Sequence, residues 1–277
     1  MLNKKTVDDL KNINGKRVLV RCDFNVPLKN GEITDETRIV AALPTINKLV
    51  GDGAKVILCS HLGKVKNGPN EGESLAPVAK RLSEKLGKEV VFVADYNVTG
   101  EAATKAVEAM KDGDVVLLQN TRFRGKEETK PEDAGEAFAK ELADLADYYV
   151  CDAFAAAHRD QPSLCGFEQL LPSAMGRLFE AEYCAVSGVM ETPERPCLFV
   201  LGGAKISDAF LMMKTVLGRG TADKVITGGL VANIFLLAKG EKIGDGSYSF
   251  IEKSGYTQFI EKAKELLEQF GDKIILP

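Results

Sequence analysis

The chain has 277 residues, of which 45% are hydrophobic and 27% are charged, and it carries a formal net charge of −4. This composition is typical of a globular protein with a sizeable core, and it excludes a disordered or fibrous chain. The charge balance lacks the basic excess of proteins that coat nucleic acids, and the apolar runs are far shorter than a membrane span. We therefore expect neither a nucleic-acid partner nor a membrane partner.

The cysteines and histidines limit the chemistry and the compartment. The chain has six cysteines but only two histidines, and no two cysteines form a C-x-x-C pair. We therefore expect no metal centre built by these residues, and we interpret the cysteines as reduced thiols with a structural role. The first residues, MLNKKTVDDLKNING, lack the apolar core of a signal peptide. These features predict a cytoplasmic protein.

Short apolar runs alternate with helical patterns along the chain. Eight runs predict strands, at Arg17–Cys22, Lys55–Cys59, Val90–Val93, Asp114–Leu118, Tyr148–Cys151, Cys197–Leu201, Lys224–Thr227 and Lys273–Leu276. Most of them are rich in Val, Ile and Leu without alternation, as in strands buried on both faces of a parallel sheet. Apolar spacing and capping residues predict helices from Thr34 or Asp35 to about Val50, with Pro44 inside, over Leu75–Leu86 and over 256–270. This order predicts an α/β fold with doubly wound parallel sheets.

A domain boundary is predicted between Gly166 and Pro196. This stretch contains a helical pattern with turn residues at both ends and no predicted strand, and the run at Cys197 then restarts the alternation. We therefore predict a first domain over residues 1–172, a connecting hinge helix over 173–195 and a second domain over 196–277. The pattern fits two Rossmann-like domains, of which the second is incomplete.

Basic side chains follow several strands of the first half. Arg38 lies on the first turn of a predicted helix, His61 and Lys64 share one loop, and Arg122 and Arg159 lie in two others. Because ligands of open α/β sheets bind beyond the carboxyl ends of the strands, these residues predict an electropositive pocket for a multiply anionic, phosphorylated ligand. The alternative for each arginine taken alone is a solvated surface charge.

Glycine-rich turns follow two strands of the second half. Gly202, Gly203, Ala204 and Lys205 form the first turn, and Gly228–Gly229 form the second. Backbone N–H groups at such turns can contact phosphate, although a glycine there is also common in an ordinary tight turn. Neither the Walker A pattern nor a G-x-G-x-x-G motif after a strand occurs. The residues favour phosphoryl transfer over dinucleotide redox chemistry.

Six motifs together resemble the phosphoglycerate kinase family. They are RCDFNVP, SHLGK, NTRF, DAFAAAHR, PERPCLFVLGGAKISD and TGGLVANIFL, and they occur in the family's order. The resemblance implies reversible phosphoryl transfer between 1,3-bisphosphoglycerate and ADP, a step of glycolysis and gluconeogenesis. It further implies that the first domain binds 3-phosphoglycerate or 1,3-bisphosphoglycerate and that the second binds ADP or ATP with Mg²⁺.

The resemblance also assigns roles by motif. The implied substrate-binding residues are Asp23, Phe24, Asn25, Arg38, His61, Leu62, Gly63, Lys64, Arg122 and Arg159. The implied nucleotide-binding residues are Gly202, Gly203, Ala204, Lys205, Gly228 and Gly229. Arg38 and Lys205 are the implied catalytic residues. The protein ligand of Mg²⁺ is expected in a family segment that lies beyond Pro277.

Some positions depart from the family's pattern. Lys64 replaces the usual arginine, Ala209 replaces a second lysine, and the family's sequence continues past Pro277. The main interpretation is a phosphoglycerate kinase of low activity, and the alternative is a truncated, catalytically impaired homologue that only binds 3-phosphoglycerate. An unrelated doubly wound domain is disfavoured by six motifs in order. We expect a monomer, although the short second half could allow self-association.

Overall fold

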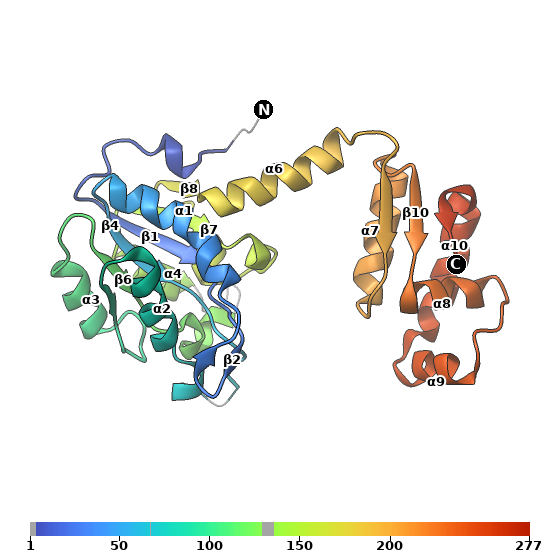
Figure 1. Cartoon of the computed structure of the whole chain (residues 1–277), viewed down its shortest axis with the longest axis horizontal. Helices are drawn as coiled ribbons and strands as arrows, with labels where there is room; N and C mark the ends of the chain where they lie inside the picture. The colour runs from blue at the N-terminus through green and yellow to red at the C-terminus, as the bar shows by residue number, and fades with distance from the viewer. Residues whose placement is uncertain (1–3, 67, 129–135) are drawn as a thin grey trace. The chain divides into compact units, whose positions relative to one another are not determined.

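A computed structural model describes residues 4–66, 68–128 and 136–277 (Figure 1). The chain divides into two compact units, over residues 1–184 and 185–277, and each is described by itself. The division falls within helix α6 (Arg177–Glu191), which occupies most of the predicted connecting segment. The domain bounds 1–172, 173–195 and 196–277 stay predictions. No helix of the described residues is both long and apolar enough to span a membrane.

The first unit is built on a six-stranded sheet in which every strand pair is parallel. Its strands are β1 (Arg17–Cys22), β4 (Lys55–Cys59), β5 (Val90–Phe92), β6 (Val115–Leu117), β7 (Tyr148–Asp152) and β8 (Ser173–Met175). Their order across the sheet is β5-β6-β4-β1-β7-β8. The five predicted runs of this half all form strands. A short antiparallel pair, β2 (Leu28–Lys29) and β3 (Glu32–Ile33), lies apart from this sheet.

Strand β8 was not predicted, and the expectation of a strand-free segment between Gly166 and Pro196 is wrong. Tyr149 pairs with Ser173 and Cys151 pairs with Met175, so β8 extends the sheet beyond β7. The three residues of β8 lie between Pro172 and Gly176. They form a strand because a long-range neighbour pairs with them, and so short a segment has no apolar period of its own.

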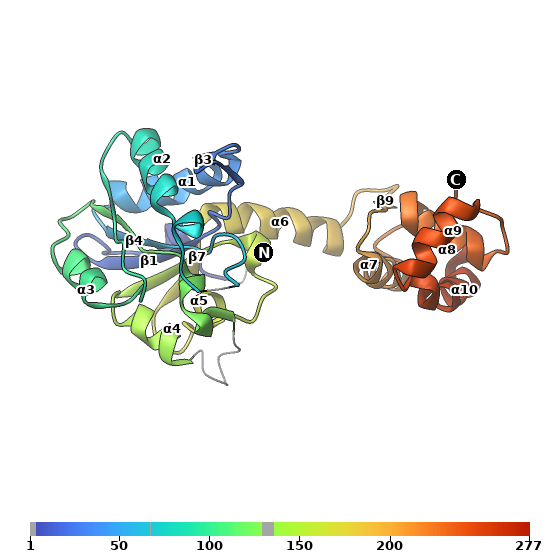
Figure 2. The same ribbon diagram turned by 90° about the horizontal axis from the view of Figure 1, so that it is seen from below.

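Helices cover both faces of this sheet, as Figure 2 shows for α1 and α2 on one side and α4 on the other. The helices are α1 (Thr37–Gly51), α2 (Ala76–Leu86), α3 (Glu101–Glu108), α4 (Glu136–Ala143) and α5 (Pro162–Cys165). Val18, Val20 and Cys22 of β1 pack in one apolar cluster with α1 and α2, whereas Leu19 packs in a second with α3 and α4. Because successive strand side chains point to opposite faces, Arg21 lies on the side of Leu19. This arrangement confirms the predicted doubly wound α/β fold.

Helix α1 begins later than the sequence pattern indicated. The prediction placed its start at Thr34 or Asp35, but the first helical residue is Thr37. The Asp35 carboxylate accepts a hydrogen bond from the Thr37 backbone N–H at 2.8 Å, so Asp35 forms a turn before the helix. This turn places Arg38 in the first turn of α1.

The second unit contains a three-stranded parallel sheet, in the order β11-β10-β9. Its strands are β9 (Leu198–Leu201), β10 (Lys224–Thr227) and β11 (Ile274–Ile275), and its helices are α7 (Ile206–Gly218), α8 (Gly229–Ala238), α9 (Asp245–Lys253) and α10 (Phe259–Phe270). The stacked rings of Phe210 and Phe235, with centroids 5.2 Å apart, lie in its core. On edge strand β9, Phe199 and Leu201 pack against this core, whereas Leu198 and Val200 are 52% and 71% exposed.

Candidate functional site

The loops that follow the central strands of the first unit are joined by hydrogen bonds. The Gly63 backbone N–H donates to Asn25 Oδ1 at 2.9 Å, which links the loop after β4 to the loop after β1. The Thr121 backbone N–H donates to the Ser60 carbonyl at 3.0 Å and links the loop after β6 to the loop after β4. Because these strands are parallel, their carboxyl ends lie at one edge of the sheet. The structure therefore brings the predicted substrate residues of these loops together.

A small pocket lies beside Asp23 and Arg38. Arg38 Nη1 donates a hydrogen bond to the Asp23 carboxylate, and Asp23 is buried while the Arg38 side chain is 46% exposed. The pocket has a volume of about 250 Å³ and is lined by Asp23, Thr37, Arg38, Ala41, Phe154, Ala155, Leu178 and Glu182. The guanidinium is therefore anchored at one nitrogen while half of its side chain faces solvent, which suits contact with an anion.

Asn120 organises the loop that carries Arg122. The Asn120 side chain caps the short 3-10 helix η3 (Thr121–Phe123) by accepting from the Arg122 backbone N–H at 3.1 Å. The same oxygen accepts from the Leu62 backbone N–H at 3.1 Å, and the side-chain NH₂ donates to the Leu62 carbonyl at 2.8 Å. The Arg122 guanidinium donates to the Gly63 carbonyl. Asn120 was not predicted as a site residue, although its place in the NTRF motif was a usable signal.

The other predicted substrate residues of this unit have different surroundings. The side chains of Phe24 and Leu62 are buried in the apolar core, so only their backbone atoms are available to a ligand. Gly63 has φ +64°, a backbone conformation that favours glycine, and a Cβ there would lie 2.9 Å from Glu73 Oε1, so the flexible Glu73 side chain would have to shift. Lys64 and Arg159 are exposed.

His61 is held as a neutral imidazole. Burial, together with the nearby positive charges of Arg21, Arg122, Arg159 and Arg38, lowers the pKa of His61 from 6.5 to about 2. Only 4% of the residue is exposed. His61 therefore contributes hydrogen bonding to the basic cluster and no charge.

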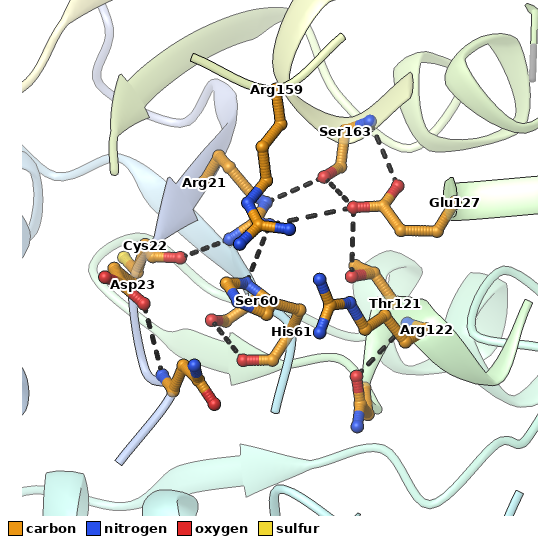
Figure 3. Close-up of polar contacts among 12 residues, drawn as sticks. Arg21, Cys22, Asp23, Ser60, His61, Thr121, Arg122, Glu127, Arg159 and Ser163 are labelled. Atoms are coloured by element: carbon orange, nitrogen blue, oxygen red, sulfur yellow. Dashed lines mark hydrogen bonds and ion pairs between the residues drawn. The ribbon is translucent and has the colours of Figure 1, made fainter. Parts of the chain in front are cut away.

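A buried polar network lies next to His61 and was not predicted (Figure 3). Arg21 of β1 is fully buried, and its Nε donates to Ser163 Oγ at 2.7 Å. Glu127, in the 3-10 helix η4 (Gly125–Glu128), is also fully buried, with Oε1 3.6 Å from Arg21 Nη2. Glu127 accepts hydrogen bonds from the Ser163 hydroxyl, from the Ser163 backbone N–H at 3.2 Å and from Thr121 Oγ1 at 3.2 Å. Burial raises the pKa of Glu127, and Arg21 opposes that rise.

The two glycine turns of the second unit lie side by side. They follow β9 and β10, and the Gly228 backbone N–H donates to the Leu201 carbonyl at 2.9 Å. A Cβ added to Gly202 would lie 3.3 Å from the Gly228 carbonyl oxygen, and Gly203 and Gly229 have φ of +91° and +54°. Residues 202–205 are exposed, with Lys205 at the N-cap of α7. Exposed backbone N–H groups of such a glycine cradle can contact phosphate.

Ala209 is a core residue of α7 and does not lie on the surface beside Lys205. It is only 7% exposed and belongs to the apolar stripe of α7 that packs in the core of the second unit.

Within the described ranges, no group of three or more His, Cys, Asp or Glu residues could hold a metal ion.

The low pKa of His61 predicts a pH dependence of folding stability. Because the unfolded chain binds a proton on this imidazole near pH 6.5 and the folded chain does not, stability falls as pH falls through that range. Between pH 7 and pH 5 this one group should remove about 2 kcal/mol from the free energy of unfolding. Urea titrations at both pH values, with His61→Gln as the non-titrating control, measure the loss. Equal pH dependence in the two proteins would contradict it.

In sequence, the chain is similar to known phosphoglycerate kinases. A family model described as Phosphoglycerate kinase matches residues 7–277. The chain is 53% identical over 279 residues to a phosphoglycerate kinase of Clostridium perfringens, covering 99% of this chain and 67% of the relative. It is 54% identical over 280 residues to that of Clostridium novyi, with coverages of 100% and 67%.

Two solved structures are similar in fold. The phosphoglycerate kinase of Pyrococcus horikoshii OT3 matches with a TM-score of 0.89 at 38% identity, over 99% of this chain and 67% of that one. The phosphoglycerate kinase of Coxiella burnetii matches with a TM-score of 0.80 at 35% identity, over 99% and 66%. The chain thus spans about two thirds of the length of these relatives.

Proposed function

Because the chain belongs to the phosphoglycerate kinase family, we propose that it serves reversible phosphoryl transfer between 1,3-bisphosphoglycerate and ADP in glycolysis and gluconeogenesis. The observation that carries this proposal is the cluster of Arg38, His61 and Arg122 at one edge of the sheet of the first unit. Two cationic side chains and one neutral imidazole suit a small molecule that carries both a phosphate and a carboxylate.

In this proposal the first unit binds 3-phosphoglycerate or 1,3-bisphosphoglycerate. Arg38 and Arg122 would contact the anionic groups, with exposed Lys64 and Arg159 adding positive charge nearby. Asp23 and Asn25 would contact the hydroxyl end of the glycerate. Arg38 is further proposed as a catalytic residue, since a guanidinium can stabilise the charge that spreads over a transferring phosphoryl group.

The second unit would bind ADP or ATP at residues 202–205 and 228–229. Support comes from the exposed glycine cradle and from Lys205, which would neutralise phosphate charge. Mg²⁺ would arrive with the nucleotide and neutralise charge on its phosphates. The domain bounds 1–172 and 196–277, with 173–195 as a hinge helix, belong to this proposal.

A cytoplasmic, monomeric protein is also part of the proposal. The cytoplasmic location is supported by the state of the cysteines, since all six are free thiols. Burial raises the pKa of the Cys22, Cys59 and Cys151 thiols, which keeps them protonated and unreactive.

The second candidate function is binding of 3-phosphoglycerate with impaired catalysis. Ala209 favours it, because this position carries no charge and its side chain lies in the core of the second unit. Both candidates require the same binding site in the first unit, and only a turnover assay separates them.

The binding site is tested by removing one arginine at a time. Arg38→Ala and Arg122→Ala should each weaken 3-phosphoglycerate binding by about 1.5–3 kcal/mol, the scale of a hydrogen bond to a charged group. Isothermal titration calorimetry of the 277-residue chain measures the change. Arg81→Ala is the matched control, because Arg81 is an exposed helix arginine whose Nη1 pairs with Glu36 at 3.0 Å. Absence of 3-phosphoglycerate binding by the unsubstituted, folded chain would overturn the proposed function.

A further inference from the structure

We propose that Arg21 and Glu127 are positioning residues that hold His61 as the neutral tautomer with its proton on Nε2, so that His61 presents an N–H donor to an anionic substrate. The identity of that substrate rests on the proposed function. The tautomer of the His61 imidazole does not depend on the proposed function, and it can be measured without any ligand.

The direction of one hydrogen bond fixes where the His61 proton lies. Arg21 Nη2 lies 3.1 Å from His61 Nδ1. A guanidinium carries only donors and stays protonated in proteins, so Arg21 must donate in this pair. His61 Nδ1 must therefore accept through its lone pair and cannot carry a proton. In a neutral imidazole the proton then lies on Nε2.

Arg21 is held in place by buried partners. All three nitrogens of its guanidinium have partners: Nε donates to Ser163 Oγ at 2.7 Å, Nη1 donates to the Cys22 carbonyl at 2.5 Å, and Nη2 faces both His61 and Glu127. Arg21, Ser163 and Glu127 are each fully buried. Because the Ser163 hydroxyl donates to Glu127 while accepting from Arg21, the two charged residues are fixed to each other directly and through Ser163. Rotation of Arg21 away from His61 would break several buried bonds at once.

Positive charges around His61 disfavour a protonated, cationic ring. Arg21 faces His61 from β1, Arg122 from η3, Arg38 from α1, and Arg159 from the loop after the 3-10 helix η6 (Phe154–Ala156). A second proton, on Nδ1, would add a positive charge to this set and would remove the acceptor that Arg21 requires. The direction of the His61 pKa agrees with this geometry, since it is lowered to about 2.

The Nε2 side of the His61 ring is the side that a ligand can contact. Among the described residues, His61 Nε2 has no hydrogen-bond partner, whereas Nδ1 is occupied by Arg21. The Nε2–H group is therefore available to a ligand oxygen. Its donor capacity should stay constant from about pH 5 to about pH 8, unlike that of a titrating histidine.

Nuclear magnetic resonance tests the tautomer directly. The full chain, labelled with ¹⁵N, is studied by long-range ¹H–¹⁵N correlation of the imidazole rings between about pH 5 and pH 8, the range in which an ordinary histidine titrates. Only His61 and His158 contribute signals, and His61→Gln assigns them by removing one set. We expect an unprotonated Nδ1 and a protonated Nε2 in His61 at every pH. A proton on Nδ1, or titration of His61 in this range, would overturn the proposal.

A paired substitution tests the positioning role. Arg21→Met combined with Glu127→Leu removes the donor without leaving a lone buried charge, so His61 should populate both tautomers and 3-phosphoglycerate binding should weaken about tenfold. Arg17→Met is the matched control, because Arg17 lies on the same strand and pairs with Asp147 instead. An unchanged His61 spectrum in the folded paired variant would overturn the positioning role. If the paired variant does not fold, the ligand-free spectrum of the unsubstituted chain still decides the tautomer. Failure of the proposed function would appear only as absent 3-phosphoglycerate binding in calorimetry.

Discussion

Replacing Arg21 alone by methionine should lower the free energy of unfolding of the first unit by about 3–5 kcal/mol, the scale of a buried ion pair that loses one partner. The physical reason is the Glu127 carboxylate, which would stay fully buried with its opposite charge removed. Burial already raises the pKa of Glu127, and Arg21 is the first group that opposes this rise. Without Arg21, folding must either protonate Glu127 or bury an uncompensated charge.

Native-state hydrogen exchange of the β1 amides reports this loss for the first unit. The double substitution Arg21→Met with Glu127→Leu should cost far less than Arg21→Met alone, because apolar groups of similar size can replace a buried pair nearly without loss. Arg17→Met is the control and should cost at most about 1 kcal/mol, since exposed pairs contribute little. The Arg17 and Asp147 side chains are 37% and 35% exposed. Strictly additive single and double effects would contradict a coupled buried pair.

The central strands show which parts of the fold the sequence could predict. β1 and β4 have the bounds that the apolar runs indicated, Arg17–Cys22 and Lys55–Cys59. Both strands have neighbours on each side and helices on each face, so burial imposes a continuous apolar run on their sequences. At the sheet edge this constraint is weaker. Strand β8 (Ser173–Met175) depends on pairing with β7, which no local pattern of three residues can reveal.

The candidate site was predictable to a similar degree. Basic residues in separate loops after the strands predicted that these loops meet at one edge of the sheet, and the structure brings the loops together there. The buried network was not predictable in this way. Arg21 opens the RCDFNVP motif inside an otherwise apolar strand, and Glu127 lies in the highly charged segment RGKEETKPED, but no local pattern links the two residues. Their partnership depends on tertiary packing that brings η4 against β1.

Position 209 shows where motif comparison needs the structure. Helical spacing alone placed residue 209 one turn beyond Lys205, which suggested that side chains at both positions could reach one anion. In the structure Lys205 is exposed at the N-cap of α7, whereas Ala209 packs with Ile206 and Phe210 in the core. A lysine at position 209 would therefore have to displace its apolar neighbours or extend past them to reach solvent.

The 277-residue chain should turn over ATP and 3-phosphoglycerate well below the range of about 1–100 per second that is typical of kinases. Transfer of a phosphoryl group depends on positive charge placed on its oxygens, and the loss of one such preorganised donor costs about a hundred- to a thousandfold in rate. Lys205 provides one charge at the glycine cradle, and Ala209 provides none where the family usually has a second lysine. A coupled assay of ATP consumption measures the turnover.

Two substitutions separate the causes of low turnover. Lys205→Ala should reduce the residual rate by a further factor of about a hundred, because it removes the remaining lysine of the GGAK turn. Ala209→Lys should raise the rate less than about tenfold, since its side chain starts in the core stripe of α7 and must reach past packed neighbours to any phosphate. Thermal unfolding of each variant verifies that the second unit remains folded. Turnover of several per second by the unsubstituted chain, or full recovery with Ala209→Lys, would show that the burial of position 209 does not limit catalysis.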